Sequence, residues 1–262
     1  MTVKLPVAID MQVIRKIISL NGVFVRLGKG NILMLNKRLL TCAEFVIGDG
    51  IAVDVGTDHA YLPVYLVKSG IVKKAYACDI AQGPLLSAQK SVEREGLSQS
   101  IRIIKSDGLE NVPPSGVSDV IIAGMGGELI EDIISRADWV KNGVNLVLQP
   151  NTKVSELMSF LYKNGFRIKS EKAVADKRFT YIVINAEYIG KPGNADIIKC
   201  IVGELDLSDA TAREYIVGQM NKLYAAAKGM QKSGDERLEN EARALIKVAD
   251  CLSELIKAGC SD

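Results

Sequence analysis

Residues 54–60, Asp-Val-Gly-Thr-Asp-His-Ala, form the densest group of side chains in this sequence that could do chemistry. They follow a short β-branched run, and an apolar, helix-like stretch begins at Tyr61. Gly56 would let the backbone approach a ligand where a Cβ would clash. The free N–H groups at the start of a helix bind carboxylates and phosphates. This segment therefore predicts a ligand-binding loop between a buried strand and a helix.

The acidic residue Asp58 indicates which ligand this loop accepts. A dinucleotide-binding loop of the GxGxxG type, counted from Gly56, would have glycine where this chain has Asp58 and Tyr61. Asp58 would repel a pyrophosphate, but it can pair with the α-ammonium of a methionine moiety. The loop therefore favours S-adenosylmethionine over a dinucleotide. The alternative is that Asp58 only caps the helix that begins near His59.

Further acidic residues and glycines follow the next three predicted strands. Asp79 stands where a carboxylate can bind ribose hydroxyls, Asp107 can accept a hydrogen bond from an adenine amine, and Gly108 would let the ring lie flat. The glycine-rich run 123–127 indicates backbone that faces a ligand. Open α/β sheets bind ligands at the carboxyl ends of their strands, so these residues should share one site. The predicted cofactor-binding residues are Asp54, Gly56, Asp58, His59, Asp79, Asp107, Gly108, Ala123, Gly124, Met125 and Gly126.

The elements that must position these residues alternate between strand and helix. Strands are predicted at 51–55, 74–78, 101–104, 117–123 and 144–148, and helices at 36–46, 61–69, 84–95 and 128–135. Such alternation predicts a parallel sheet covered on both faces. Two last strands, at 166–174 and 179–186, are too close in sequence for a crossover helix and should form an antiparallel hairpin. The predicted fold class is α/β, a Rossmann-like doubly wound sheet with a terminal antiparallel hairpin, as in class I methyltransferases.

A helical region follows a domain boundary that we predict at 190–195. Beyond it, apolar residues recur at alternating spacings of three and four, in two sets separated by Ser233-Gly234-Asp235. This pattern predicts an antiparallel coiled-coil hairpin of two α-helices. The hairpin could cap the first domain or form an arm that binds nucleic acid or a partner, and the sequence leaves both open. The predicted domains are thus 34–190, Rossmann-like, and 191–262, helical.

Composition excludes several classes of protein. The 262 residues are 48% hydrophobic with a net charge of +2, which is typical of a globular chain without a dominant charge. No apolar run reaches the roughly 18 residues that a membrane span requires, so we expect no membrane contact. The five cysteines are scattered and never form a CxxC pair, which argues against a metal site and disulfides and favours the reducing cytoplasm. Any nucleic-acid binding must use a local basic patch.

Residues 1–33 are basic and lack the apolar core and cleavage site of a secretory signal. Gly28-Lys29-Gly30 must be encoded by purine-rich codons, and Met34 follows at the spacing that separates a ribosome-binding site from a start codon. We therefore expect Met34 to be the natural initiator and 1–33 to be a non-native or upstream extension.

Five segments together resemble one family of RNA-modifying enzymes. They are 54–63, Gly83-Pro84, Asp107-Gly108-Leu109, 122–127 and 148–151. From Met34 to its end the chain is similar to the bacterial tRNA adenine-N1 methyltransferases that modify adenine 22 of tRNA. That family pairs a Rossmann-like domain with a C-terminal helical hairpin. The resemblance implies S-adenosyl-L-methionine as cofactor and tRNA as partner, with the target adenine entering near 124–127 and 149–151.

The chemistry of the substrate decides which residues are catalytic candidates. Adenine N1 carries a lone pair in its neutral form, so its methylation requires no general base. His59, the only histidine, is therefore assigned to the cofactor loop. The catalytic candidates are Asp58, which could stabilise developing positive charge, and Gln149 and Asn151, whose amides can pair with an adenine edge. A simple turn after the fifth strand is an equal alternative for residues 149–151.

The sequence also contains basic residues that could bind the phosphates of RNA. The candidates for binding phosphates are Lys37, Arg38, Lys153, Lys163, Arg167, Lys169, Lys172, Lys177 and Arg178. The hairpin could contact tRNA or a second subunit. Two other functions fit the same sequence. One is a small-molecule methyltransferase with the hairpin as a lid or dimer contact, and the other is a catalytically silent cofactor-binding partner protein.

Overall fold

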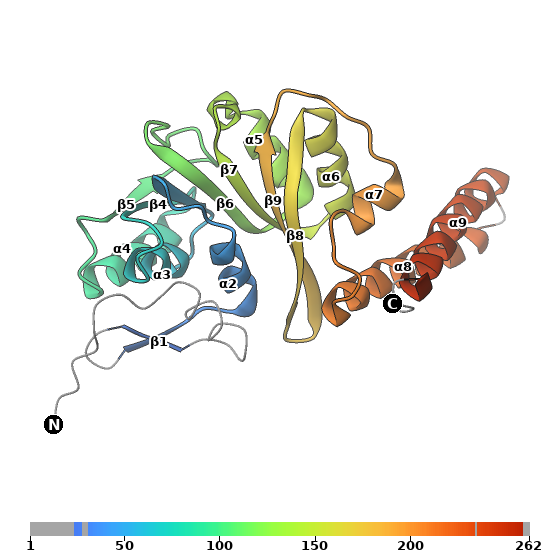
Figure 1. The fold of residues 1–262 in the computed structure, drawn as a ribbon, viewed down its shortest axis with the longest axis horizontal. Helices are drawn as coiled ribbons and strands as arrows, with labels where there is room; N and C mark the ends of the chain where they lie inside the picture. Colours follow the sequence, from blue (N-terminus) through green and yellow to red (C-terminus); the bar gives the residue numbers. More distant parts are fainter. Residues whose placement is uncertain (1–23, 28–30, 234, 259–262) are drawn as a thin grey trace.

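The computed structural model describes residues 24–27, 31–233 and 235–258 of the chain. Its centre is a seven-stranded sheet with the order β5-β4-β3-β6-β7-β9-β8 (Figure 1). The first five of these strands run parallel, whereas β9 is antiparallel to β7 and β8. The strands are β3 (Ile51–Val55), β4 (Lys74–Asp79), β5 (Ile101–Lys105), β6 (Val117–Gly126), β7 (Asn145–Thr152), β8 (Phe166–Asp176) and β9 (Phe179–Tyr188). This order confirms the predicted α/β, Rossmann-like doubly wound sheet and its terminal hairpin.

Helices cover both faces of this sheet. One core contains α2 (Lys37–Glu44), α3 (Tyr61–Lys68) and α4 (Gln82–Arg94). The core on the other face contains α5 (Gly127–Ser135), η1 (Asp138–Lys141), α6 (Val154–Lys163) and α7 (Ile197–Val202). The sequence did not predict η1, α6 or α7. For α6 the reason is local, because its N-cap residue Lys153 is left-handed (φ 56°) and makes no side-chain capping bond.

The strands β6 and β7 are longer than the sequence predicted. Both continue past their apolar runs, and their ends pair as Ala123↔Gln149, Met125↔Pro150 and Gly126↔Thr152, with shifts in register between these pairs. The prediction that the glycine-rich run and residues 149–151 follow their strands was therefore wrong. Pairing between the two strands stabilises extended backbone even where glycine and proline are unfavourable to it.

The N-terminal region adds a small separate sheet. Strands β1 (Phe24–Leu27) and β2 (Asn31–Met34) pair antiparallel. Most of the predicted extension 1–33 lies outside the described residues, so its origin stays a prediction. Helix α2 then begins after Asn36, whose side chain accepts a hydrogen bond from the Leu39 N–H (2.9 Å).

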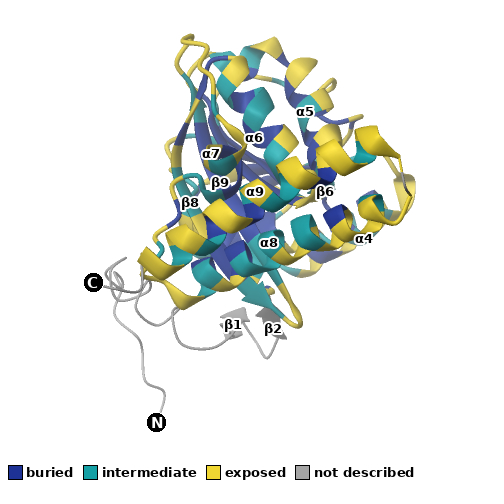
Figure 2. Cartoon of the chain, turned by 90° about the vertical axis from the view of Figure 1, so that its right-hand side faces the viewer, coloured by how far each residue is buried: buried dark blue, intermediate teal, exposed yellow. Residues whose placement is uncertain are grey.

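The C-terminal region is a pair of antiparallel helices, α8 (Ala210–Gln231) and α9 (Glu236–Ala258). Figure 2 shows exposed residues along their outer sides. Tyr215 and Ile216 of α8 and Leu252 of α9 are fully buried in the same core as β8 and β9. Farther out, the Tyr224 hydroxyl donates to Asp250 (2.6 Å) and fixes the register of the two helices. The base of this helical pair is therefore part of the core of the sheet domain.

For the described residues, the structure can be compared with the predictions about membrane spans, metal sites and cysteines. No helix is long and apolar enough to cross a membrane. No group of three or more His, Cys, Asp or Glu side chains is arranged to hold a metal ion. Cys42, Cys78, Cys200 and Cys251 are free thiols, and the first three are buried.

A buried carboxylate lies where the helical region joins the sheet. Glu171 of β8 accepts a hydrogen bond from the backbone N–H of Glu204, in the turn that begins at Gly203. Burial raises the pKa of Glu171 from 4.5 to about 7, and the negative charge on Glu204 acts in the same direction, whereas the hydrogen bond from the Glu204 N–H and the charge on Lys199 oppose it. The folded state therefore binds a proton that the unfolded state has released between these two pH values.

We expect Glu171→Gln to stabilise the protein above pH 7. In the wild type, Glu171 makes stability fall as pH rises from about 4.5 to about 7, because ionising this buried group is unfavourable only in the folded state. Glutamine keeps an acceptor for the Glu204 N–H and removes the charge, which should add up to about 3 kcal/mol at pH 8. Urea unfolding at pH 5 and pH 8 measures this. An unchanged pH dependence in the variant would contradict the prediction.

Candidate functional site

The loop after β3 packs directly against the end of β6. The N–H groups of Gly56 and Thr57 both donate to the Cys78 carbonyl of β4 (2.8 and 2.9 Å). Gly56 has φ +77°, and a Cβ placed there would lie 2.2 Å from the Met125 methyl carbon. The structure thus brings together two predicted cofactor-binding segments that are far apart in the sequence.

One buried hydroxyl in this loop lies beside a carboxylate. The Thr57 hydroxyl oxygen is buried, and its interaction with Asp54 lowers the pKa of that carboxyl against the larger effect of burial. Thr57 and Asp54 thus place two polar groups together at the loop. The site therefore fits a ligand with polar groups, such as the amino-acid part of S-adenosylmethionine. Thr57 lies within the segment 54–60, but nothing in the sequence predicted that its hydroxyl would be buried there.

The neighbouring residues Asp58 and His59 lie at the surface. The Asp58 carboxylate is 78% exposed and lies 3.4 Å from the His59 imidazole, which stacks on the Tyr61 ring at a centroid distance of 5.0 Å. Helix α3 begins at Tyr61, and its N-cap, the left-handed Ala60, makes no side-chain capping bond. The alternative that Asp58 caps this helix is therefore wrong. Asp58 remains free to meet a ligand from solvent.

Asp54 is the buried carboxylate of the loop. It is only 8% exposed at the end of β3. Burial raises the pKa of Asp54 from 3.8 to about 6, and the charge on Asp79 adds to this effect. An ammonium group bound nearby would favour the ionised form of Asp54 and lower its pKa again.

We expect cofactor binding to depend on the ionisation of Asp54. Below pH 6 the free protein carries a proton on Asp54 that a cationic ligand must displace, so affinity should fall by up to about tenfold per pH unit. The Asp54→Asn variant should bind S-adenosyl-L-methionine more weakly at pH 8 and lose this dependence. Isothermal titration calorimetry from pH 5 to pH 8 tests both. Equal pH profiles for the two proteins would rule out a role for Asp54.

The remaining predicted cofactor-binding carboxylates already have protein partners. Asp79 accepts a hydrogen bond from the Ala81 N–H (2.7 Å), which fixes the turn after β4. Asp107 forms an ion pair with Arg136 of α5 (3.2 Å), and Arg136 also contacts Glu110 and Asp132. Asp79 is the last residue of β4, and Asp107 lies two residues beyond the end of β5. Arg136 was not predicted near this edge.

The predicted glycines serve packing as well as access. Gly108 has φ +54°, and a Cβ there would lie 2.9 Å from the side chain of Ile133. Gly127 passes the next turn so closely that a Cβ would lie 2.3 Å from the Lys153 carbonyl oxygen. Gly124 has φ +82° with little around it, so its backbone is the most open of the run. Contact between protein segments, and not only a ligand, therefore explains Gly108 and Gly127.

Arg38 of α2 binds both predicted catalytic amides. Its Nη1 donates to Gln149 Oε1 (2.7 Å) and to Asn151 Oδ1 (3.4 Å). Its Nε faces Asp176 Oδ2 at 3.4 Å, and its guanidinium lies 4.6 Å from the centre of the Tyr181 ring. The sequence assigned Arg38 to phosphate binding, but here it is held by protein groups. No sequence spacing could reveal this contact, because 111 residues separate Arg38 from Gln149.

The Arg38 contacts fix the orientation of the two amides. Gln149 is completely buried, and its Nε2 donates to the Pro150 carbonyl (3.0 Å) and to Asn151 Oδ1 (3.2 Å). Asn151 is exposed, and its Nδ2 donates to the Gly124 carbonyl (2.7 Å). One Nδ2 hydrogen of Asn151 therefore remains for a ligand. Gln149 is placed to support Asn151 and cannot reach a base from inside the strand.

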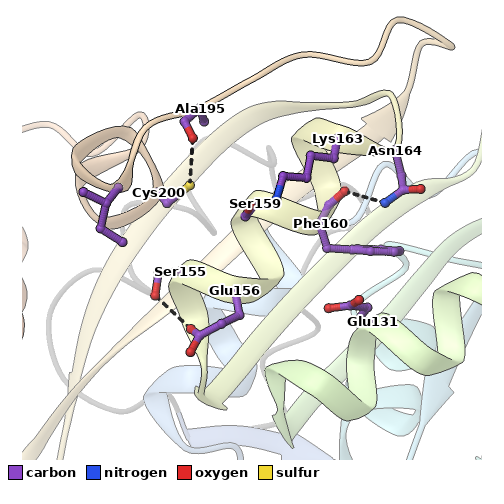
Figure 3. Close-up of a pocket in the computed structure, with 10 residues that line it drawn as sticks. Glu131, Ser155, Glu156, Ser159, Phe160, Lys163, Asn164, Ala195 and Cys200 are labelled. Atoms are coloured by element: carbon purple, nitrogen blue, oxygen red, sulfur yellow. Dashed lines mark hydrogen bonds between the residues drawn. The ribbon is translucent and has the colours of Figure 1, made fainter. Parts of the chain in front are cut away.

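Two cavities lie on the α6 side of this edge. The larger, about 650 Å³, lies between α5, α6 and α7 and is lined by Glu131, Glu156, Lys163 and Cys200, among others (Figure 3). None of the predicted catalytic or cofactor-binding residues lines it. The smaller, about 420 Å³, is lined by Asn151, Thr152, Tyr181 and Lys222, among others. Of these two cavities, the smaller one is lined by Asn151, one of the predicted catalytic amides.

The strand order and the ligand loop after β3 define a methyltransferase. The family described as "Methyltransferase domain" matches residues 35–184, more than half of the chain. The tRNA (adenine(22)-N(1))-methyltransferase of Bacillus subtilis is 36% identical over 176 residues, which cover 67% of this chain and 74% of that relative. The chain belongs to the tRNA (adenine(22)-N(1))-methyltransferase family.

Two solved structures extend this similarity beyond the matched domain. The B. subtilis m1A22 tRNA methyltransferase TrmK has a TM-score of 0.77 at 29% identity, with 86% of this chain and 99% of that chain covered. Streptococcus pneumoniae Sp1610, solved in complex with S-adenosyl-L-methionine, has a TM-score of 0.73 at 30% identity, with 85% and 100% covered. Both alignments span more of the chain than the methyltransferase domain alone.

Proposed function

We propose that this protein transfers the methyl group of S-adenosyl-L-methionine to N1 of an adenine in tRNA, at position 22. The observation that carries the proposal is the meeting of the Gly56 loop with the end of β6, beside the exposed amide of Asn151. The named relative, which shares more than a third of the aligned residues, supports the choice of substrate. S-adenosyl-L-methionine supplies an electrophilic methyl group, so the protein must mainly position the acceptor.

The cofactor-binding roles follow the predicted residues. The amino-acid part of the cofactor would bind at the end of β3 and the loop that follows, which contain Asp54, Gly56, the buried Thr57, Asp58 and His59. Asp79 would meet the ribose. Asp107 and Gly108 would meet the adenine ring of the cofactor, and Ala123, Gly124, Met125 and Gly126 form the wall between cofactor and target. Asp58 is exposed and able to face developing positive charge on the substrate.

Asn151 is the residue best placed to contact the target base. Its free Nδ2 hydrogen can donate to a ring nitrogen of adenine other than N1. N1 then keeps its lone pair for the methyl group. The extruded base must leave the tRNA structure to reach this position, which is a cost that the enzyme's contacts offset.

Binding of tRNA would use basic side chains that have no carboxylate partner. Of the predicted phosphate-binding residues, Arg167 and Lys169 pair with Glu187, Lys172 pairs with Glu44 and Lys153 pairs with Glu128 and Glu156. Among the described contacts, Lys37, Lys163, Lys177 and Arg178 have no such partner. These four are the better candidates for phosphate contacts, together with the helical hairpin. Cytoplasmic localisation stays a prediction.

The proposal is tested by mass analysis of tRNA after incubation with isotopically labelled S-adenosyl-L-methionine. We expect one labelled methyl group, at N1 of adenine 22, and no label on a transcript with guanine at that position. Asn151→Ala should reduce labelling without weakening cofactor binding. The proposal fails if the purified protein binds the cofactor and never labels unmodified tRNA. Label on small molecules alone would favour the small-molecule alternative.

The role of the hairpin requires a truncation that keeps the core intact. Removing 191–262 would also remove the buried Tyr215 and Ile216. Because Tyr224 and Asp250 face each other, deleting 226–248 and joining the ends by a short glycine loop keeps the base of both helices. If the hairpin binds tRNA, the KM for tRNA should rise by about tenfold or more, with cofactor affinity unchanged. An unchanged KM would restrict tRNA binding to the sheet domain.

A further inference from the structure

The smaller cavity lies next to the proposed methyl-transfer site and is separate from it. Its volume of about 420 Å³ is within the range of small-ligand pockets, which begin at roughly 300 Å³. The end of β7, the start of α6, the start of β9, the helix α7 and residues 215–223 of α8 form its walls. Asn151 belongs both to this wall and to the Gly124 contact. None of the predicted cofactor-binding residues lines it. A molecule in this cavity would therefore lie on the side of Asn151 that faces away from the methyl donor.

The walls of this cavity combine flat apolar surface with unused polar groups. Tyr181, Ile182, Tyr215 and Leu223 supply aromatic and aliphatic surface. Three polar lining residues, Thr152, Gln219 and Lys222, have no side-chain partner among the described contacts. Unpaired donors and acceptors beside apolar surface are what a nucleobase with its phosphate requires.

Charge distinguishes this cavity from its larger neighbour. The smaller cavity has Lys153 and Lys222 against one carboxylate, Glu156, which is already paired with Lys153 (3.4 Å). The larger cavity has two carboxylates, Glu131 and Glu156, against Lys163 (Figure 3). The smaller cavity is therefore the more favourable of the two sites for a polyanion.

We infer that the smaller cavity binds the nucleotide that adjoins the target adenosine in the RNA strand. This inference rests on the proposed function, since the occupant is part of the same RNA. The neighbour's base would lie against Tyr181 and Leu223 and pair with Gln219. Lys222 would contact its phosphate. Holding the neighbour on one side of Asn151 would keep the target base extruded on the other side.

The test combines protein variants with altered RNA. Transcripts carry an abasic residue at the 5′ or the 3′ neighbour of the target adenosine, one at a time. For the wild type, one of the two abasic transcripts should have a KM raised by about tenfold, because stacking and pairing with the missing base are lost. In Gln219→Ala and in Leu223→Trp, which fills the cavity, the intact transcript should already show that loss. The abasic residue should then change KM less than about twofold further.

Matched controls separate this site from general attraction of RNA. Lys228→Ala removes the same charge as Lys222→Ala from the same helix, outside the cavity. In Lys228→Ala, the rise in KM caused by the abasic residue should be as large as in the wild type. Lys222→Ala should instead raise KM for the intact transcript. Cofactor affinity and thermal unfolding verify that each variant is folded. If the abasic residue raises KM equally in the wild type and in the cavity variants, the inference is overturned although methylation still occurs. If the wild type does not methylate tRNA at all, the proposed function is overturned instead.

Discussion

Replacing Arg38 by alanine should lower kcat for tRNA methylation by about 100-fold, since hydrogen bonds from a charged donor contribute roughly 1.5–3 kcal/mol. The change removes the donor to Gln149 Oε1 and leaves that buried oxygen without a partner. Asn151 Oδ1 loses one of its two donors, so its amide is then held only by Gln149 Nε2 and the Gly124 carbonyl. Arg38 does not reach the predicted cofactor loop. Affinity for S-adenosyl-L-methionine should therefore stay unchanged.

The Arg38 prediction is measured by steady-state kinetics with tRNA, together with calorimetric cofactor binding. Arg38→Lys keeps the charge but lacks the planar fork that contacts both amides, so its kcat should be intermediate. Added guanidinium should partly restore Arg38→Ala, as expected for a positioning residue. Lys90→Ala, which removes an exposed cation of α4 that has no predicted role, serves as the control. A parallel loss of cofactor binding, or no loss of kcat, would contradict the assignment.

The sequence could predict the loop around Gly56 because everything that defines it is local. A β-branched run, a glycine and a helix follow one another within a few residues, and the parallel sheet that surrounds them follows from the alternation of elements. The placement of Asp79 and Asp107 at neighbouring strand ends was predictable for the same reason. Their placement follows from the rule that the carboxyl ends of parallel strands lie at the same edge of the sheet.

Contacts between distant segments could not be predicted in this way. Arg38 meets Gln149 and Asp176 only because α2 packs against the strand ends of β7 and β8. The exposed position of Asp58 and the buried position of Gln149 also depend on how neighbouring elements pack. The sequence pattern showed that residues 149–151 were of interest, and it could not show that one amide supports the other.

The Gly127→Ala variant should lose both stability and activity. The added Cβ would lie 2.3 Å from the Lys153 carbonyl oxygen and 3.0 Å from the Thr152 carbonyl oxygen, both backbone atoms. Relief requires a shift of the turn between β7 and α6, at a cost of about 1–3 kcal/mol or more. Lys153 is already left-handed in that turn, so it has little room to adapt.

The same shift should separate Asn151 from the Gly124 carbonyl, because Asn151 lies two residues before Lys153. We therefore expect a free energy of unfolding lower by about 2 kcal/mol and a kcat lower by at least about tenfold. Gly229→Ala is the control. Gly229 lies in α8 with open space around it, so alanine there should be neutral or stabilise the helix by up to about 1 kcal/mol. Urea unfolding and kinetics distinguish the outcomes. Lost stability with full kcat would mean that the turn at Lys153 does not position Asn151, and that its side-chain contacts with Arg38 and Gln149 are sufficient to hold the amide in place.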